Sequence, residues 1–302
     1  MEELLFVGSC FADSIGQRFR EEHFPVIVNP YGTMYNPVSV LHTIERMGAP
    51  SNLPRLGEAC LAESECAAKV SPSQGRPEGV PRIVFITLGT NHVYRLKETG
   101  EIVDNCQKRP QRLFDEETLS VGECAGYLQQ IVEVLRSRRP DVQIVFTVSP
   151  IRYQKYGFHE SQLSKATLLL AVQSLECRVE SVEFATALDD CAEGTAVANS
   201  PLSTLHSKLN YFPAYEIVLD ELRDYRFYKE DMLHPSAQAV EYIWQQLVAH
   251  YFSPRAKQFL QDWKPIKDAL NHRPFHPESE DYQRFLAEAK RKEKDLLAAY
   301  HV

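Results

Sequence analysis

The sequence lacks several features on which whole classes of protein depend. It has no apolar run of the roughly 20 residues that a membrane-spanning helix needs, and it does not start with a basic segment, an apolar stretch and a cleavage site. It has no excess of positive charge: the formal net charge is −8, which argues against a nucleic-acid partner. It has no Cys-x-x-Cys motif, and its 7 cysteines are odd in number. We therefore expect a protein of the reducing cytoplasm with free thiols, and neither a membrane nor a nucleic-acid partner.

Short apolar runs alternate with helical patterns along most of the 302 residues. The predicted strands are residues 4–7, 24–28, 83–86, 142–148 and 211–212, and the predicted helices begin near residues 14, 38, 121, 164, 214 and 237. Strands separated by helices favour a parallel sheet that is covered on both faces. We therefore predict one α/β domain over residues 1–252 and a helical C-terminal extension over 253–302 that packs on it.

Three stretches have little apolar character and are predicted to lie outside this regular core. Residues 48–82 are rich in Gly, Pro, Ser and Glu, and residues 183–208 are polar. Both are predicted to be surface excursions, the first of them mobile. Residues 102–115 show no clear periodicity and are predicted to be irregular.

A candidate nucleophile lies at the end of the first predicted strand. The apolar run Leu4–Val7 is followed by Gly8, which permits a tight turn, and then by Ser9 and Cys10, just before a helical pattern that begins at Ser14. Such a turn exposes a side chain at the carboxyl end of a strand, next to the free N–H groups and the positive dipole end of a helix. A hydroxyl and a thiol are thus both candidates for the attacking group.

A candidate general base lies late in the chain, in the segment Asp231-Met232-Leu233-His234, just before the last predicted helix of the domain. A carboxylate three residues before a histidine suits a base and its partner, because the carboxylate fixes the imidazole tautomer and stabilises the imidazolium. We expect His234 and the turn at Ser9 and Cys10 to meet at the carboxyl ends of the parallel strands. The histidines have no metal-ligand spacing, so we expect neither a metal nor an organic cofactor.

The segment Gly8-Ser9-Cys10-Phe11-Ala12 is the signature for which the GSCFA-domain family is named, and its strand-turn-helix setting resembles the first block of the SGNH (GDSL-like) hydrolases. Asp231-x-x-His234 resembles the last block of that superfamily. Further similarity to the GSCFA branch lies at residues 147–152, 164–166 and 211–216. The resemblance implies a flavodoxin-like three-layer α/β sandwich with a short parallel sheet. It also implies an esterase or acyltransferase that works through a covalent acyl-enzyme.

The resemblance implies roles for individual residues. Aligned without gaps, Cys10 falls on the serine nucleophile of the superfamily, whereas Ser9 would serve if the turn were shifted by one residue. His234 would act as the general base, and Asp231 would orient it. Beside an imidazolium and a helix N-terminus, the Cys10 thiol is expected to have a lowered pKa.

The resemblance also implies an oxyanion hole and a substrate class. The expected donors are the backbone N–H groups of Cys10 and Gly32 and the side chain of Asn91, with Asn105 as a rival to Asn91. The expected substrate is a small-molecule or carbohydrate ester. Asn91 is followed by His92, where many members of the superfamily have Asp. This departure, and a cysteine in place of the serine, leave open a second reading: a non-catalytic binding or interaction protein on the same scaffold.

Overall fold

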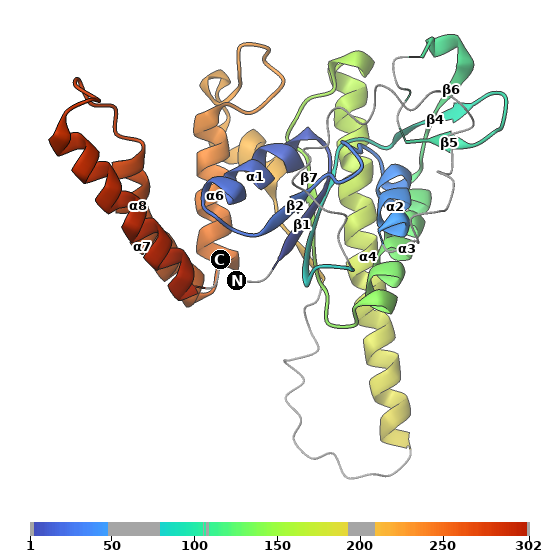
Figure 1. The fold of residues 1–302 in the computed structure, drawn as a ribbon. Coiled ribbons are helices and arrows are strands. Elements are labelled where there is room, and N and C mark those ends of the chain that lie inside the picture. The colour runs from blue at the N-terminus through green and yellow to red at the C-terminus, as the bar shows by residue number, and fades with distance from the viewer. Residues whose placement is uncertain (1–2, 48–78, 105, 107–108, 193–208, 301–302) are drawn as a thin grey trace.

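A five-stranded parallel sheet forms the centre of the protein (Figure 1). The computed structural model describes residues 3–47, 79–104, 106, 109–192 and 209–300. The strands of the central sheet are β1 (Leu4–Gly8), β2 (Val26–Val28), β3 (Ile83–Leu88), β7 (Gln143–Val148) and β8 (Leu209–Tyr211). Their spatial order is β2-β1-β3-β7-β8, and each neighbouring pair is parallel. Counted within this sheet, the order is 2-1-3-4-5, which is the flavodoxin-like order. The predicted fold class is confirmed.

Helices cover both faces of the sheet, as Figure 1 shows. One layer consists of α2 (Pro37–Arg46), α3 (Val121–Arg138) and α4 (Phe158–Ala192), and the other contains α1 (Cys10–Glu21) and α6 (Ala237–Tyr251). Side chains of β1 alternate between the two layers: Leu5 and Val7 pack with the first, and Leu4 and Phe6 pack with the second. Burial on both faces explains why β1 is a continuous apolar run.

Aromatic rings fix α1 to the sheet. The rings of Phe6 and Phe85 are stacked with their centroids 4.6 Å apart. Phe19 on α1 lies 5.0 Å from Phe6 and 4.9 Å from Trp244 on α6. All four side chains are buried, and each contributes about 1.5–3 kcal/mol to stability. This cluster therefore fixes the last turns of α1 against the sheet and α6.

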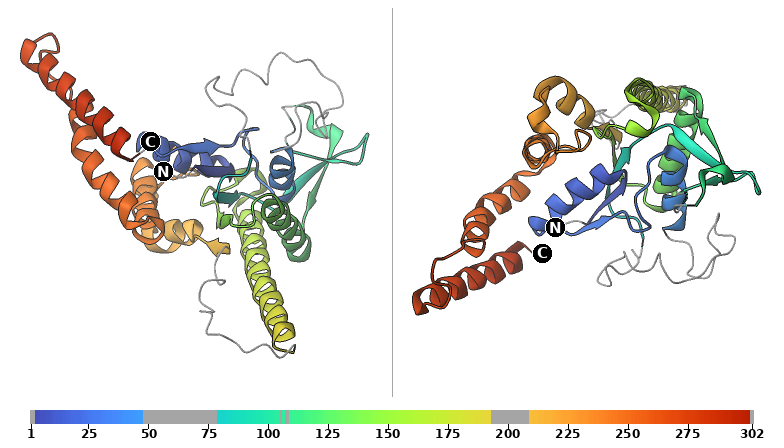
Figure 2. Two further views of the ribbon diagram at one scale, coloured as in Figure 1. Left: turned by 60° about the horizontal axis from the view of Figure 1, so that its bottom comes forward. Right: turned by 90° about the horizontal axis from the view of Figure 1, so that it is seen from above.

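After α6 the chain forms a helical hairpin of α7 (Pro254–Leu270) and α8 (Glu280–Tyr300). Phe259 and Trp263 of α7 are buried in the same apolar cluster as α1 and α6, and Lys267 forms an ion pair with Glu22 at 2.8 Å. The turn between the two helices points away from the sheet (Figures 1 and 2). The predicted helical C-terminus is confirmed, whereas the domain boundary at residue 252 stays a prediction.

A second, antiparallel sheet departs from the prediction. It consists of β4 (His92–Leu96), β5 (Ile102–Val103) and β6 (Phe114–Thr118) in the order β5-β4-β6. The expectation that residues 102–115 are irregular is therefore wrong for residues 102–103 and 111–115, whereas residues 104, 106 and 109–110 lie outside helices and strands. In β6 Phe114 is buried and the other residues are exposed, and ion pairs such as Arg95 with Glu117 at 3.0 Å join the strands. The apolar alternation from which strands are predicted is missing here because charged pairs connect the strands.

Helix α4 is longer than predicted. It begins before residue 164 and continues to Ala192, so the predicted excursion over 183–208 is wrong for residues 183–192. Figure 1 shows its second half extending past the edge of the sheet. Residues 183–192 contain three alanines and one leucine, which are strong helix formers and favour continuation of the helix. The rest of this excursion, and residues 48–78 of the other one, lie outside the described residues.

Short helical turns lead from the last strand to the loop that carries His234. These are α5 (Ala214–Glu216), a π-helical turn (Ile217–Leu222) and a 3₁₀ turn (Tyr225–Phe227); two further 3₁₀ turns lie at Gln111–Leu113 and Gln154–Tyr156. In the part of the chain that the structure describes, no helix has both the length and the apolar content to cross a membrane.

Candidate active site

The turn after β1 depends on a close approach of two backbones. Gly8 has a φ of +138°, and a Cβ at this position would lie 2.0 Å from the carbonyl oxygen of Thr87 on β3. A side chain therefore does not fit there. The Gly8 N–H donates to Asn29 Oδ1 at 2.8 Å, and the Ser9 N–H donates to the Thr87 carbonyl oxygen at 3.0 Å. These contacts direct the chain from the carboxyl end of β1 into α1.

Ser9 and Cys10 have different environments. Ser9 is the N-cap of α1 and is 1% exposed, and its Oγ accepts a hydrogen bond from the Phe11 N–H at 3.3 Å. Cys10 is the first residue of α1 and is half-buried. Its Sγ lies 3.7 Å from His234 Nε2. The thiol, rather than the hydroxyl, contacts the histidine.

Asp231 holds His234 through three contacts. Its Oδ2 lies 2.6 Å from His234 Nδ1, and its Oδ1 accepts from the N–H groups of Leu233 and His234 at 2.9 and 3.0 Å. These hydrogen bonds, above all those from the two backbone N–H groups, lower the pKa of Asp231 to about 2. An ionised carboxylate at Nδ1 keeps the imidazole proton there. Nε2 is then left as an acceptor that faces the Cys10 thiol.

The loop that carries His234 is also attached to the segment after β7. The Arg152 N–H donates to the Leu233 carbonyl oxygen at 3.3 Å, and the Lys229 N–H donates to the His234 carbonyl oxygen at 2.7 Å. The Arg152 guanidinium lies 4.1 Å from the centre of the Tyr228 ring, which is a cation–π contact. The position of the imidazole thus depends on the sheet as well as on α6.

The surroundings of the Cys10 thiol contradict the expectation that its pKa is lowered. Burial raises the pKa of this thiol, and the Asp13 carboxylate raises it further. The Cys10 backbone N–H and the charges of Lys165 and Lys229 act in the opposite direction and do not compensate. The expectation is wrong because burial outweighs the helix N-terminus and the nearby cations. The resting thiol is therefore protonated at neutral pH, and it needs a base that takes its proton during attack.

A polar network that sequence reasoning missed joins the ends of β1 and β2. Asn29 Nδ2 donates to Asp13 Oδ1 at 2.8 Å, and Thr33 Oγ1 donates to Asp13 Oδ2 at 3.2 Å. Asn29 also accepts from Gly8, as described above. The available signal was the position of Asn29 directly after a strand and of Asp13 in the first turn of a helix. These residues hold the turn that presents Cys10.

Two of the predicted oxyanion donors, the Gly32 N–H and the Asn91 side chain, each have an acceptor within the protein. Gly32 is exposed, and its N–H donates to the Asn29 carbonyl oxygen at 2.9 Å. Asn91 is buried, and its Nδ2 donates to the Leu119 carbonyl oxygen at 2.7 Å. Its Oδ1 has no hydrogen-bond partner among the described residues. Asn105, the rival donor, lies outside the described residues. The oxyanion roles of Gly32 and Asn91 stay predictions.

A buried lysine on α4 lies close to the turn, and sequence reasoning gave it no role there. Lys165 is 2% exposed, and its Nζ donates to the Gly89 carbonyl oxygen at 2.6 Å. Gly89 packs against Ser9, since a Cβ at Gly89 would lie 3.3 Å from Ser9 Cβ. Burial lowers the pKa of Lys165 to about 7. The available signal was its place on the apolar stripe of α4, three residues before the buried Leu168.

Stacked aromatic side chains connect this region with the second sheet. The Tyr35 and Tyr153 rings are 5.5 Å apart, and Tyr153 is stacked with Tyr156 at 5.5 Å. Tyr156 is in turn stacked on His92 of β4 at 3.7 Å. The Tyr35 carbonyl oxygen accepts from the Gly89 N–H at 2.8 Å. This hydrogen bond connects the aromatic side chains with the carboxyl end of β3. Burial raises the pKa of Tyr153 and of Tyr156, so both phenols are uncharged at neutral pH.

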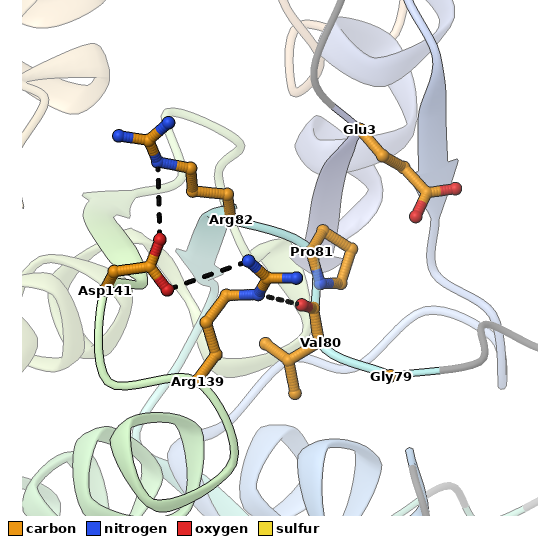
Figure 3. A pocket seen from close by; sticks show the side chains of 7 residues that line it. All are labelled: Glu3, Gly79, Val80, Pro81, Arg82, Arg139 and Asp141. Carbon is orange, nitrogen blue, oxygen red and sulfur yellow. Dashed lines mark hydrogen bonds and ion pairs between the residues drawn. The ribbon is translucent and has the colours of Figure 1, made fainter.

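A pocket of about 360 Å³ lies at the opposite edge of the sheet (Figure 3). Its lining includes Glu3, Val80, Arg82, Arg139 and Asp141, which precede β1, β3 and β7. Arg82 and Arg139 each lie 3.7 Å from the Asp141 carboxylate. None of the candidate catalytic residues lines it, because those residues follow the carboxyl ends of the strands.

The protein is an α/β protein in which a thiol contacts an imidazole and the imidazole contacts a carboxylate, at the carboxyl edge of a parallel sheet. The sequence pattern of the GSCFA family matches residues 3–66, 80–189 and 192–247, and that of the GSCFA domain protein, C-terminal domain, matches residues 263–301. The chain belongs to the GSCFA family. A comparison with curated proteins finds no match.

Several solved structures are similar to this chain at low sequence identity. A member of the lipolytic protein G-D-S-L family from Veillonella parvula is 10% identical, covers 82% of this chain and 97% of its own, and has a TM-score of 0.39. A carbohydrate esterase of family 3 from Talaromyces cellulolyticus is 10% identical; the match covers 87% of this chain and 99% of the esterase, with a TM-score of 0.37. A family two carbohydrate esterase from Clostridium thermocellum, in complex with cellohexaose, is 13% identical; the match covers 82% of this chain and 62% of the esterase, with a TM-score of 0.38.

Proposed function

We propose that the protein hydrolyses or transfers acyl groups through a thioester on Cys10. The observation that carries this proposal is the series of contacts from Cys10 Sγ to His234 Nε2 at 3.7 Å and from His234 Nδ1 to Asp231 at 2.6 Å. Cys10 and His234 are 224 positions apart in the sequence, so the fold brings the pair together. A nucleophile, a base and a group that orients the base are the parts that covalent acyl transfer requires.

In the acylation step, Cys10 Sγ attacks the ester carbonyl carbon while His234 Nε2 takes the thiol proton. The S–C bond forms, and the carbonyl π pair moves to oxygen. The oxyanion then collapses, the bond to the alcohol oxygen breaks, and the alcohol leaves with the proton from His234. Water or an acceptor hydroxyl attacks the thioester in the same way and regenerates the thiol. Asp231 stabilises the imidazolium in both steps.

The N-terminus of α1 supplies one donor to the proposed oxyanion hole. Cys10 is the first helical residue, so its N–H has no acceptor within the helix, and the positive end of the helix dipole adds to its effect. Gly32 completes the hole only by exchanging its present acceptor, the carbonyl oxygen of Asn29, for the oxyanion. Asn91 Nδ2 donates to the Leu119 carbonyl oxygen with one of its two N–H groups and has a second for the oxyanion. A preorganised donor of this kind is worth about 3–4 kcal/mol of barrier.

The proposed substrate is a small-molecule or carbohydrate ester, as the family resemblance implies. The proposed compartment is the reducing cytoplasm. Cys10, Cys106 and Cys124 are free thiols in the structure, which supports a reducing compartment.

Turnover of p-nitrophenyl acetate by the purified full chain tests this function. We expect Cys10→Ala and His234→Ala to abolish turnover. Ser9→Ala serves as the matched control: it removes an N-cap worth about 1 kcal/mol and leaves measurable turnover. A Ser9→Ala protein without activity, beside an active Cys10→Ala protein, would reverse the assignment of the nucleophile.

The second candidate function is a binding protein without ester chemistry. The observation that favours it is the engagement of the Gly32 N–H by the Asn29 carbonyl oxygen. A wild-type protein that folds but neither turns over acyl p-nitrophenyl esters nor becomes acylated by them supports this second function and contradicts the first.

A further inference from the structure

The burial of Lys165 is not explained by stability. The side chain is 2% exposed, and its one hydrogen-bond acceptor among the described residues is the Gly89 carbonyl oxygen at 2.6 Å. None of the described carboxylates forms an ion pair with it, and Cys10 is the one charged group that acts on its pKa. An ammonium group has three N–H donors, and burying a charge without a counter-charge is unfavourable. An apolar side chain of similar length would suit this position on α4 better.

Gly89 places the Lys165 ammonium beside the turn that carries the nucleophile. A Cβ at Gly89 would lie 3.3 Å from the Cβ of Ser9, the residue before Cys10. The charge of Lys165 lowers the pKa of the Cys10 thiol, and the Cys10 thiolate in turn raises the pKa of Lys165. The other charged side chains that act on this sulfur are Asp13 of α1 and Lys229, which lies in the loop of His234.

We propose that the Lys165 ammonium group balances the negative charge that develops on Cys10 Sγ and on the acyl oxygen during attack. This inference rests on the proposed function, because it takes Cys10 as the nucleophile. In the resting protein the thiol is neutral, and Lys165 has no counter-charge among the described residues. When His234 takes the thiol proton, the sulfur and then the oxyanion supply that counter-charge.

An interaction that exists only while charge develops lowers the barrier without tightening the binding of the substrate. It also adds to an oxyanion site in which the Gly32 N–H donates to the Asn29 carbonyl oxygen in this structure. Lys165 thus has the function of an electrostatic partner to Cys10, supplied by the helix layer opposite α1.

Alkylation of Cys10 by iodoacetamide tests the proposal without any substrate. The rate would be followed by peptide mass spectrometry between pH 6 and 9.5 for the wild type, Lys165→Met and Lys165→Arg. Lys257→Met is the matched control, since Lys257 Nζ also donates to a single carbonyl oxygen, that of Ala249, but on the exposed surface of α7. Circular dichroism shows whether each variant folds, and Lys165→Gln replaces the methionine variant if that one does not.

We expect Lys165→Met to slow alkylation of Cys10 by up to about tenfold at pH 6, where Lys165 is protonated, and we expect this difference to shrink above pH 7, where the resting Lys165 is neutral. Lys165→Arg should keep a rate closer to the wild type, and Lys257→Met should not differ from it. A folded Lys165→Met protein with the wild-type alkylation profile would overturn the proposal. If Lys165→Met slows the alkylation of Cys10 but the wild type turns over no ester, the coupling of Lys165 to Cys10 is supported and only the proposed function is contradicted.

Discussion

Replacing Lys165 by methionine should stabilise the protein, and by an amount that depends on pH. The pKa of Lys165 falls from 10.5 to about 7 on burial. The unfolded chain therefore binds a proton between pH 7 and 10.5 that the folded chain does not bind. The free energy of unfolding of the wild type consequently falls as the pH decreases through this range. A shift of about 3.5 units corresponds to about 5 kcal/mol.

Urea unfolding of the wild type and of Lys165→Met at pH 6.5, 7.5, 8.5 and 9.5 measures this effect. The other titrating groups are common to both proteins, so the difference in unfolding free energy isolates Lys165. We expect the variant to be the more stable protein at pH 6.5, and its advantage to shrink by about 1.4 kcal/mol for each pH unit above 7. Lys257→Met should follow the wild type at every pH.

A difference between Lys165→Met and the wild type that does not change with pH would refute this reasoning. It would mean that Lys165 keeps an ordinary pKa in the folded protein. A methionine variant that is less stable at every pH would show instead that the ammonium stabilises the fold, and the argument that burial is unfavourable would fail.

Three further predictions concern the turn and the base. Gly8→Ala should lower the free energy of unfolding by about 2–4 kcal/mol in urea titrations, because its Cβ would meet the Thr87 carbonyl oxygen; an unchanged midpoint would contradict the close approach. Asp231→Asn should reduce ester turnover by at least about a hundredfold with little change in melting temperature, since the Asp231 side chain is 43% exposed; full turnover would remove it from the mechanism. The pH profile of turnover in the wild type should show no loss from Asp231 until the pH approaches about 2, because its lowered pKa keeps the carboxylate ionised above that value; a loss near pH 4 that Asp231→Asn abolishes would contradict this pKa.

The central sheet could be predicted from the sequence because its strands are buried on both faces. Leu4–Val7 and residues 83–86 are continuous apolar runs for this reason. The β4–β6 sheet could not be predicted, because ion pairs such as Arg95 with Glu117 join its strands and leave no apolar period. Strand prediction from hydrophobic pattern fails where charge pairing replaces burial.

Contacts within one loop of the candidate site could be predicted from the sequence, whereas properties that depend on tertiary packing could not. Asp231 and His234 contact each other within one loop, so their spacing alone indicated the pair. The pKa of Cys10 depends on burial, which no spacing reveals, and the dipole argument therefore gave the wrong direction. The sequence places Lys165 at the edge of the apolar face of α4, and the ammonium group of a lysine in such a position usually reaches solvent. Only the structure shows that it does not.

Acylation of Cys10 is the central step of the proposed mechanism. Rapid quenching of the wild-type protein during turnover of p-nitrophenyl acetate, followed by peptide mapping, measures this. We predict one acetyl group on Cys10, removed by neutral hydroxylamine as thioesters are and absent from Cys10→Ala. An acetyl group on Ser9 that resists neutral hydroxylamine, or turnover without acylation of either residue, would show that Cys10 is not the nucleophile.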